Sequence, residues 1–233
     1  MRLDVCSLVL AMALSASGAL SADLPAPDAQ YPVSKPSVPD ALLHPDSIFV
    51  FGGGLSTGAL KDTLQFNLNP SAGRIRYDNF IAGAAYNHNF YYLGYGFALG
   101  AEIGLADRFG YYAMCCDTVI KSPGMLNSLE LWVGPRISFD GVVLFDAIKI
   151  GVAATMGFSF TTNSIGRERQ AEVSWDGSAR VLFYLGPELS FSLINHPDWE
   201  FVYGLHHRSG ANGVLGNLRE GYNANVIGLR HKF

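Results

Sequence analysis

Much of the chain beyond residue 90 alternates between apolar residues and small or charged ones. The alternation is regular over residues 93–105, 129–139, 148–160, 181–191 and 199–209. A period of two is typical of a β-strand, because successive side chains of a strand point to opposite faces. Each segment therefore predicts a strand with one apolar face and one face of small or charged residues.

Two less regular segments, 48–57 and 75–86, and the alternating last segment 223–233 raise the number of expected strands to eight. Hydrophobic residues make up 49% of the chain and charged residues 15%, which favours a membrane protein. Beyond the N-terminus no apolar run reaches the roughly 18 residues that a spanning helix needs. Closed barrels are the other solution for crossing a bilayer. We therefore expect an all-β fold, an eight-stranded antiparallel transmembrane β-barrel with its apolar faces toward lipid.

The connections between the expected strands alternate in length. Residues 87–92, 140–141 and 195–198 are short connections, and Asp140-Gly141 is a two-residue hairpin signal. Residues 58–74, 106–127, 161–178 and 210–222 are long. Short turns of such barrels belong to the periplasm and long loops to the exterior. Segment 199–209 then runs outward, and Ser209 lies at its outer end.

The N-terminal part has the features of an export signal. Arg2, the apolar stretch 5–14 and a run of small residues predict a signal peptide over 1–22, with cleavage after Ala22 or Ala19. Residues 23–47 hold six of the eleven prolines and predict an extended periplasmic segment. The barrel then occupies 48–233, in the outer membrane of a bacterium. The terminal Phe233 is typical of a last strand that the barrel assembly machinery recognises.

Charged residues fall on the face that would point into the barrel. Eight strands leave an interior that side chains fill, and buried charges must be paired. We expect a structural network rather than a catalytic site, formed by Glu102, Glu130, Glu188 and Glu200 with Arg136, Lys149, Arg180 and Arg230. The net charge of −4 comes without a basic patch, so nucleic acid is not an expected partner. The adjacent Cys115 and Cys116 are interpreted as incidental loop residues, and no metal or cofactor is expected.

Candidate chemistry appears at the outer end of segment 199–209, which reads WEFVYGLHHRS. His207 and Ser209 share a face and have Cα atoms about 6.6 Å apart. A serine hydroxyl needs such a base to act as a nucleophile, and a third group should orient the imidazole. Glu220 is the one carboxylate in the segment that follows. His206 has the opposite parity and is expected to point into the barrel.

A base and a nucleophile on a lipid-facing wall suit the cleavage of an acyl chain from a membrane lipid. A His-x-Ser pair also occurs by chance, and the rims of barrels are polar in any case. A non-catalytic small outer-membrane barrel with a structural or surface-interaction role therefore stays open as the alternative.

The segment LHHRSGANG, the region of Glu220 and the ending IGLRHKF resemble the lipid A 3-O-deacylase (acyloxyacyl hydrolase-like) family. That resemblance implies an eight-stranded outer-membrane barrel and a serine carboxylic ester hydrolase without a cofactor. Its substrate would be lipid A of lipopolysaccharide in the outer leaflet. By the pattern of the family, His207 would be the base, Ser209 the nucleophile and Glu220 the orienting acid.

The chain departs from the family at the residue after the serine. Well-studied members carry an asparagine there, which is thought to help bind the oxyanion, whereas this chain has Gly210. Either the Gly210 backbone N–H or the Asn212 side chain is then the candidate oxyanion donor. Outer membrane phospholipase A has a similar His-x-Ser arrangement with an asparagine as third member and calcium. It uses twelve strands, for which this chain is too short.

Overall fold

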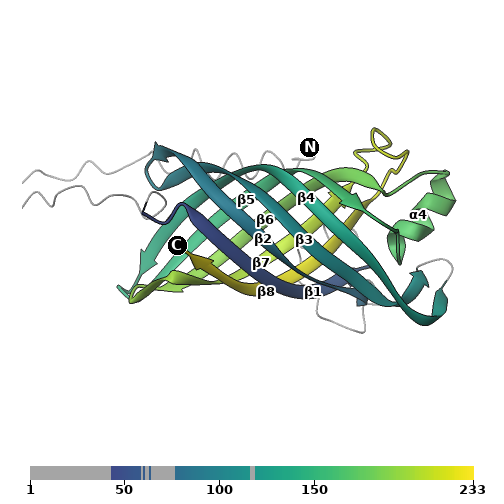
Figure 1. Cartoon of the computed structure of the whole chain (residues 1–233), viewed down its shortest axis with the longest axis horizontal. Coiled ribbons are helices and arrows are strands. Elements are labelled where there is room, and N and C mark those ends of the chain that lie inside the picture. Colours follow the sequence, from purple (N-terminus) through teal and green to yellow (C-terminus); the bar gives the residue numbers. More distant parts are fainter. Residues whose placement is uncertain (1–42, 59, 61–62, 64–76, 116–118) are drawn as a thin grey trace, which may run out of the picture. The chain divides into compact units, whose positions relative to one another are not determined.

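A computed structural model describes residues 43–58, 60, 63, 77–115 and 119–233 of the chain. Eight antiparallel strands form one sheet, in which each strand pairs with the next and β1 pairs with β8, so that the barrel closes (Figure 1). The prediction of an eight-stranded antiparallel barrel is confirmed. The strands are β1 (Asp46–Ser56), β2 (Tyr77–Gly94), β3 (Phe97–Met114), β4 (Ile120–Leu144), β5 (Ile148–Thr161), β6 (Val181–Leu193), β7 (His196–Ser209) and β8 (Gly221–Lys232).

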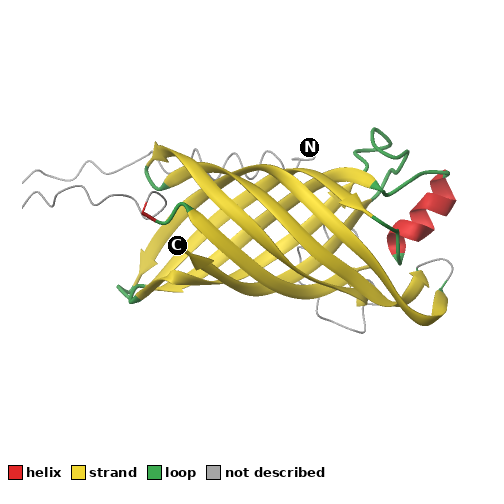
Figure 2. Ribbon diagram, in the orientation of Figure 1, coloured by secondary structure: helices red, strands yellow, loops and turns green. Residues whose placement is uncertain are grey.

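The two ends of the barrel differ. Backbone hydrogen bonds join Asp46 to Phe233 in both directions, at 3.2 and 2.9 Å, so the first and last strands meet at one end. Helix α4 (Arg167–Trp175) lies at the opposite end (Figure 2). Strand β7 runs toward the α4 end, and Ser209 is its last residue. In the described part of the chain, no helix has the length and apolar character to cross a membrane.

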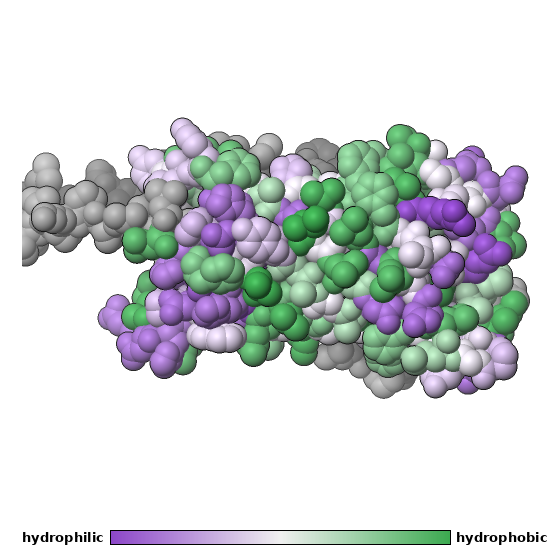
Figure 3. All heavy atoms as spheres, viewed as in Figure 1, coloured by the Kyte–Doolittle hydropathy of each residue, from purple (hydrophilic) through white to green (hydrophobic). Residues whose placement is uncertain are grey.

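The outer wall of the barrel is apolar at mid-height. Outward positions such as Leu131, Val133, Phe201 and Ile227 are 42–55% exposed, and the residues between them are buried in the barrel. On the visible face, apolar side chains gather over the middle of the strands and hydrophilic ones toward both ends (Figure 3). The alternation in the sequence thus separates an outer apolar surface from an inner polar one.

The interior is filled by aromatic and charged side chains. Trp132 is 1% exposed, and its ring centroid lies 6.0 Å from Phe51, 5.5 Å from Tyr184 and 4.9 Å from His206. These rings come from four different strands. They occupy the centre of the barrel, as expected for a ring of eight strands.

An ion-pair network continues the filling toward the end where the chain terminates. Arg136 contacts Glu102 at 2.9 Å and Glu188 at 2.5 Å, while Arg230 contacts Glu188 at 2.5 Å and Glu200 at 3.2 Å. All five side chains are almost inaccessible, so each charge needs its partners. This part of the predicted network is confirmed.

Three members of the predicted network lie elsewhere. Lys149 pairs with Asp140 at 2.8 Å, and Arg180 is exposed because it lies in the connection before β6. Glu130 belongs to a second cluster near α4, described below. The reason is height along the barrel: side chains with inward parity pair only when they also lie at the same level.

Two of the predicted turns are wrong. Residues 87–92 continue strand β2, and the chain turns at Tyr95 between Gly94 and Gly96, all three with positive φ. Asp140-Gly141 forms a bulge inside β4, where the pairing register shifts and Gly141 has φ 107°. The hairpin turn comes later, at residues 145–146. Glycine relieves strain in a bulge as readily as in a turn, so local sequence did not separate the two.

The strands also extend further than predicted. Most of residues 106–127, expected to be a loop, belong to β3 and β4, where Tyr112 pairs with Lys121. Apolar alternation lapses there although the backbones stay paired, because a strand beyond a bilayer need not present an apolar face. The expected signal peptide 1–22, most of the proline-rich segment 23–47 and Cys116 lie outside the described residues.

Candidate functional site

The candidate site is centred on a pair of side chains from neighbouring strands. His207 of β7 lies opposite Asn223 of β8, and its Nδ1 is 2.6 Å from Asn223 Oδ1. Asn223 Nδ2 donates at 3.1 Å to the carbonyl of Gly58. A carbonyl can only accept, so the amide nitrogen faces Gly58 and the amide oxygen faces His207. The neutral imidazole then carries its hydrogen on Nδ1, and Nε2 is an acceptor.

The imidazole leans toward the row of Ser209. Gly221 lies opposite Ser209, and a Cβ atom on Gly221 would be 2.5 Å from His207 Cε1. The ring therefore passes over the Gly221 backbone, where a side chain would displace it. Ser209 Oγ accepts a hydrogen bond from the Ala211 N–H at 3.1 Å. The described contacts include no direct hydrogen bond between His207 and Ser209.

The parity expected for the two histidines is confirmed for His206. Its side chain is 4% exposed and lies inside the barrel, with Nε2 2.7 Å from Glu130. His207, one residue later, points to the other face and is partly accessible. The pair Leu205 and Asn225 shares that outer face, but Leu205 is only 3% exposed, unlike the apolar residues lower on the wall.

Glu220 does not contact His207. Its carboxylate accepts hydrogen bonds from Nε and Nη2 of Arg167 at 3.0 and 2.9 Å. Arg167, the first residue of α4, also donates to the carbonyl of Thr57. The described contacts of Glu220 are thus with Arg167, and the side chain in contact with the imidazole is that of Asn223. Residues 221 and 223 share a face of the strand, and residue 220 has the opposite parity.

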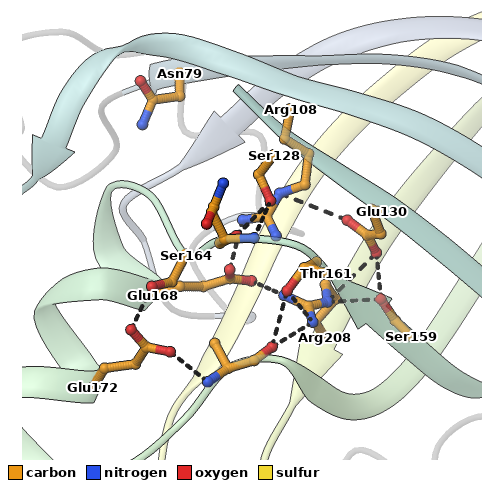
Figure 4. Close-up of polar contacts among 12 residues, drawn as sticks. Asn79, Arg108, Ser128, Glu130, Ser159, Thr161, Ser164, Glu168, Glu172 and Arg208 are labelled. Atoms are coloured by element: carbon orange, nitrogen blue, oxygen red, sulfur yellow. Dashed lines mark hydrogen bonds and ion pairs between the residues drawn. The ribbon is translucent and has the colours of Figure 1, made fainter. Parts of the chain in front are cut away.

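The interior side of the site is held by residues that the sequence analysis did not identify. Arg208, which lies between the two site residues, is 2% exposed and points into the barrel, where it donates to Ser159 Oγ at 2.8 Å and to the carbonyl of Ala179 at 2.7 Å. It also pairs with Glu168 from the first turn of α4, which Arg108 contacts at 2.7 Å (Figure 4). The sequence signal for this contact was the parity of Arg208, which lies between two outward residues and therefore points inward.

Glu130 completes this second cluster of charges. Its carboxylate lies 3.4 Å from Arg208 Nε and 3.6 Å from Arg108 Nε, and it accepts from Ser159 at 2.6 Å. Glu168 approaches the same two arginines from α4 (Figure 4). Glu168 therefore anchors α4 to the two arginines inside the barrel, on the inner side of the strand that carries the candidate site.

The loop after Ser209 has a constrained backbone. Ala211 and Asn212 have φ of 47° and 56°, a left-handed conformation that strains residues other than glycine. A Cβ atom on Gly210 would be 2.1 Å from the Leu218 carbonyl oxygen, so an asparagine would not fit in this backbone. The Asn212 side chain is exposed. The amide that contacts Ser209 Oγ is that of Ala211 rather than Gly210.

Comparisons with known proteins give few matches. No protein-family model matches the chain, and no curated protein matches it in sequence. Within the described ranges, no group of three or more potential metal ligands converges.

Three solved outer-membrane proteins are similar in structure. The outer-membrane enzyme PagL aligns with a TM-score of 0.44 and 10% identity, over 80% of this chain and 99% of its own. Ail, the attachment invasion locus protein of Yersinia pestis, aligns with 0.36 and 8%, over 82% and 99%. OprG of Pseudomonas aeruginosa aligns with 0.34 and 11%, over 82% and 96%.

Proposed function

We propose that this protein is an outer-membrane esterase that hydrolyses an ester-linked acyl chain of lipid A in lipopolysaccharide. The observation that carries the proposal is the placement of His207. Its imidazole lies on the outer wall, its Nδ1 is held by Asn223, and its ring is turned toward the row of Ser209. A lipid acyl ester reaches that wall from the membrane without entering the filled interior.

The exposed surface supports a location in the bacterial outer membrane. A closed sheet whose outward side chains are apolar and 40–60% exposed at mid-height buries them in lipid. The barrel end that carries α4 lies opposite the end where the first strand begins and the last strand finishes. With the start of β1 and the end of β8 on the periplasmic side, His207 and Ser209 lie near the outer leaflet, where lipopolysaccharide is found.

The chemistry would follow the general scheme of a serine hydrolase. Ser209 Oγ forms a bond to the ester carbonyl carbon while His207 Nε2 takes its proton. The alcohol oxygen of the lipid leaves and takes that proton from Nε2, and an acyl-serine remains. Water then attacks the acyl carbon, gives a proton to Nε2 and releases the fatty acid as Ser209 recovers its hydrogen.

In this scheme Asn223 takes the role of orienting group. Its neutral amide accepts the Nδ1 hydrogen and keeps Nε2 available, although it lacks the charge with which a carboxylate stabilises an imidazolium. The Ala211 N–H, which donates to Ser209 Oγ before substrate binds, joins the Gly210 N–H and the Asn212 side chain as a candidate oxyanion donor, because it lies beside the nucleophile and would have to turn from Oγ to the carbonyl oxygen of the substrate. A donor within about 3 Å of the developing oxyanion is what such a site requires.

Glu220 acts, in the same proposal, through the backbone. Its pairing with Arg167 ties the start of β8 to α4 and, through the Thr57 carbonyl, to the end of β1. These contacts hold Gly221 and Asn223 in register with Ser209 and His207. Glu220 is thus a positioning residue.

A non-catalytic barrel is the second candidate, and one observation favours it. The Ser209 hydroxyl accepts a hydrogen bond from Ala211, while the described contacts show none from Ser209 to His207. Catalytic hydrogen bonds are often long or misaligned before the substrate binds, so the two candidates must be separated by experiment.

The deciding experiment compares lipid A from cells that over-express the wild type and the Ser209→Ala variant at equal outer-membrane levels. Mass spectrometry should show the loss of one acyl chain with the wild type and intact lipid A with the variant. Intact lipid A and intact phospholipids in both strains would leave the non-catalytic barrel as the correct interpretation.

A further inference from the structure

A hydrogen-bonded bridge of three polar side chains crosses the outer wall beside the candidate site. Tyr203 of β7 donates to Asn225 Oδ1 of β8 at 2.7 Å, and Asn225 Nδ2 donates to the hydroxyl of Tyr77 of β2 at 2.6 Å. Strand β1 lies between β8 and β2, and there the bridge passes over Gly54. A Cβ atom on Gly54 would be 2.7 Å from the Tyr77 ring, so the glycine allows the ring to lie against the wall.

This bridge interrupts a surface that is otherwise apolar. Phe80, Phe201 and Ile227 flank it on the same outer face, and they are 47–55% exposed. Polar groups on a lipid-facing wall are costly unless they are hydrogen-bonded. The bridge satisfies the amide oxygen of Asn225 and one of its two amide hydrogens.

Tyr77 and Asn225 each keep one hydrogen to donate after the two hydrogen bonds of the bridge are formed. A phenol that accepts one hydrogen bond still has its own hydrogen to donate, and an amide nitrogen has two hydrogens. These two donor groups lie 2.6 Å apart on the outer wall, where Tyr77 is 43% exposed. At this depth of a membrane, the complementary acceptor is the carbonyl oxygen of an acyl linkage.

The bridge borders the candidate site on the membrane side. Asn225 is two residues from Asn223 on β8, a separation of about 6.6 Å along the strand. Tyr77 lies opposite Ser56, which in turn lies opposite Asn223, the partner of His207. The Tyr77 ring lies against Gly54, which pairs with Asn225. A lipid with two acyl linkages close together could place one at Ser209 and the other at the bridge.

We propose that Tyr77 and Asn225 form a subsite that binds the carbonyl oxygen of a second acyl chain of the same lipid. The proposal rests on the proposed function, since it names what else that substrate must carry. It makes the preferred substrate a lipid with at least two neighbouring acyl linkages, one of which is cleaved while the other is recognised and left intact.

A binding experiment tests the subsite without relying on turnover. The full-length protein carries Ser209→Ala, and its retention of a two-chain probe is titrated by native mass spectrometry. The probe is a glucosamine phosphate with one ester-linked and one amide-linked acyl chain. Its matched analogue joins the second chain through an ether oxygen, which keeps the chain and removes only the carbonyl.

Tyr77→Phe removes one hydroxyl and leaves the ring over Gly54. It should weaken binding of the two-carbonyl probe by roughly 3- to 10-fold, the effect of one lost hydrogen bond, and leave binding of the ether analogue unchanged. Tyr86→Phe is the control, because Tyr86 lies on the same outer face of β2 and bonds Asp46 at the opposite rim. Asn225→Leu should reproduce Tyr77→Phe.

Equal affinity of the two probes for the Ser209→Ala protein, or an equal loss for both probes in Tyr77→Phe, would overturn the subsite. A parallel assay with Ser209 intact reports on the proposed function separately. There Tyr77→Phe should raise KM for the two-chain ester and leave kcat, and hydrolysis of a single-chain ester, unchanged. Absence of hydrolysis would refute the esterase, while the binding result would still decide the subsite.

Discussion

The Nδ1 atom of His207 lies 2.6 Å from the amide oxygen of Asn223, on the strand that pairs with its own. The contact specifies which imidazole nitrogen can accept a proton, and it does so with a neutral partner. Asn223→Ala should lower kcat by on the order of 100-fold, within the range expected for impaired general-base catalysis.

Asn223→Asp separates two contributions of this residue. Aspartate can still accept the Nδ1 hydrogen but cannot donate to the Gly58 carbonyl, so activity should exceed that of Asn223→Ala while stability falls. Hydrolysis rates and thermal unfolding of the purified barrel measure the two effects. Full activity of Asn223→Ala would contradict an orienting role.

Gly221 provides a test of the ring position. Gly221→Ala places a methyl group 2.5 Å from His207 Cε1, so the imidazole must move away from the row of Ser209. Hydrolysis should fall strongly while the barrel still assembles. Gly124→Ala is the matched control, because a Cβ there meets no atom of the described residues within 4 Å. Equal activities of the two variants would show that hydrolysis does not require the His207 ring in this position.

The neighbouring histidines should respond in opposite ways to substitution. His207→Ala and Ser209→Ala should abolish hydrolysis and still assemble, since neither truncation leaves a cavity in the core. His207→Ala also leaves the buried Asn223 amide oxygen without its partner, so it should lose more stability than Ser209→Ala. His206→Ala removes a buried partner of Glu130 and should destabilise the barrel by about 1–3 kcal/mol. The assembled fraction of His206→Ala should retain the kcat of the wild type. Urea unfolding and steady-state hydrolysis kinetics, measured on the same preparations, compare the three variants.

The Arg167–Glu220 pair should behave as one unit. Arg167→Ala and Glu220→Ala should each reduce activity modestly, and the double variant should be no worse than either alone. The pair is partly exposed, at 20% and 40%, so its effect on stability should be within about 1 kcal/mol. The exchange Arg167→Glu with Glu220→Arg should recover part of the activity. A much larger loss of activity for Glu220→Ala than for Arg167→Ala would instead indicate that Glu220 contacts the imidazole directly.

Asn212 allows the oxyanion candidates to be distinguished. Asn212→Gly removes the amide side chain and suits the left-handed backbone at this position. An unchanged rate is expected, because the side chain is exposed and the Ala211 N–H is the group in contact with Ser209 Oγ. A fall of roughly 100-fold or more would assign the Asn212 amide to the oxyanion site.

The number of strands and the face of each side chain could be predicted from the sequence. Both depend on a period of two, which is a property of the backbone of each strand by itself. The inward position of His206 and the outward parity shared by His207 and Ser209 follow from that period. The interior pairing of Arg136 with Glu102 and Glu188 was expected for the same reason, since inward charges must find one another.

The partners across strands were decided only by the closed barrel. Asn223 rather than Glu220 meets His207 because the register of β7 on β8 sets which residues are opposite, and register depends on contacts far along the chain. Glu168 meets Arg208 because the loop before β6 carries a helix back into the mouth of the barrel. Gly141 forms a bulge because β5 stays paired beyond it. Local alternation does not predict these contacts, because they depend on how distant strands pair in the closed barrel.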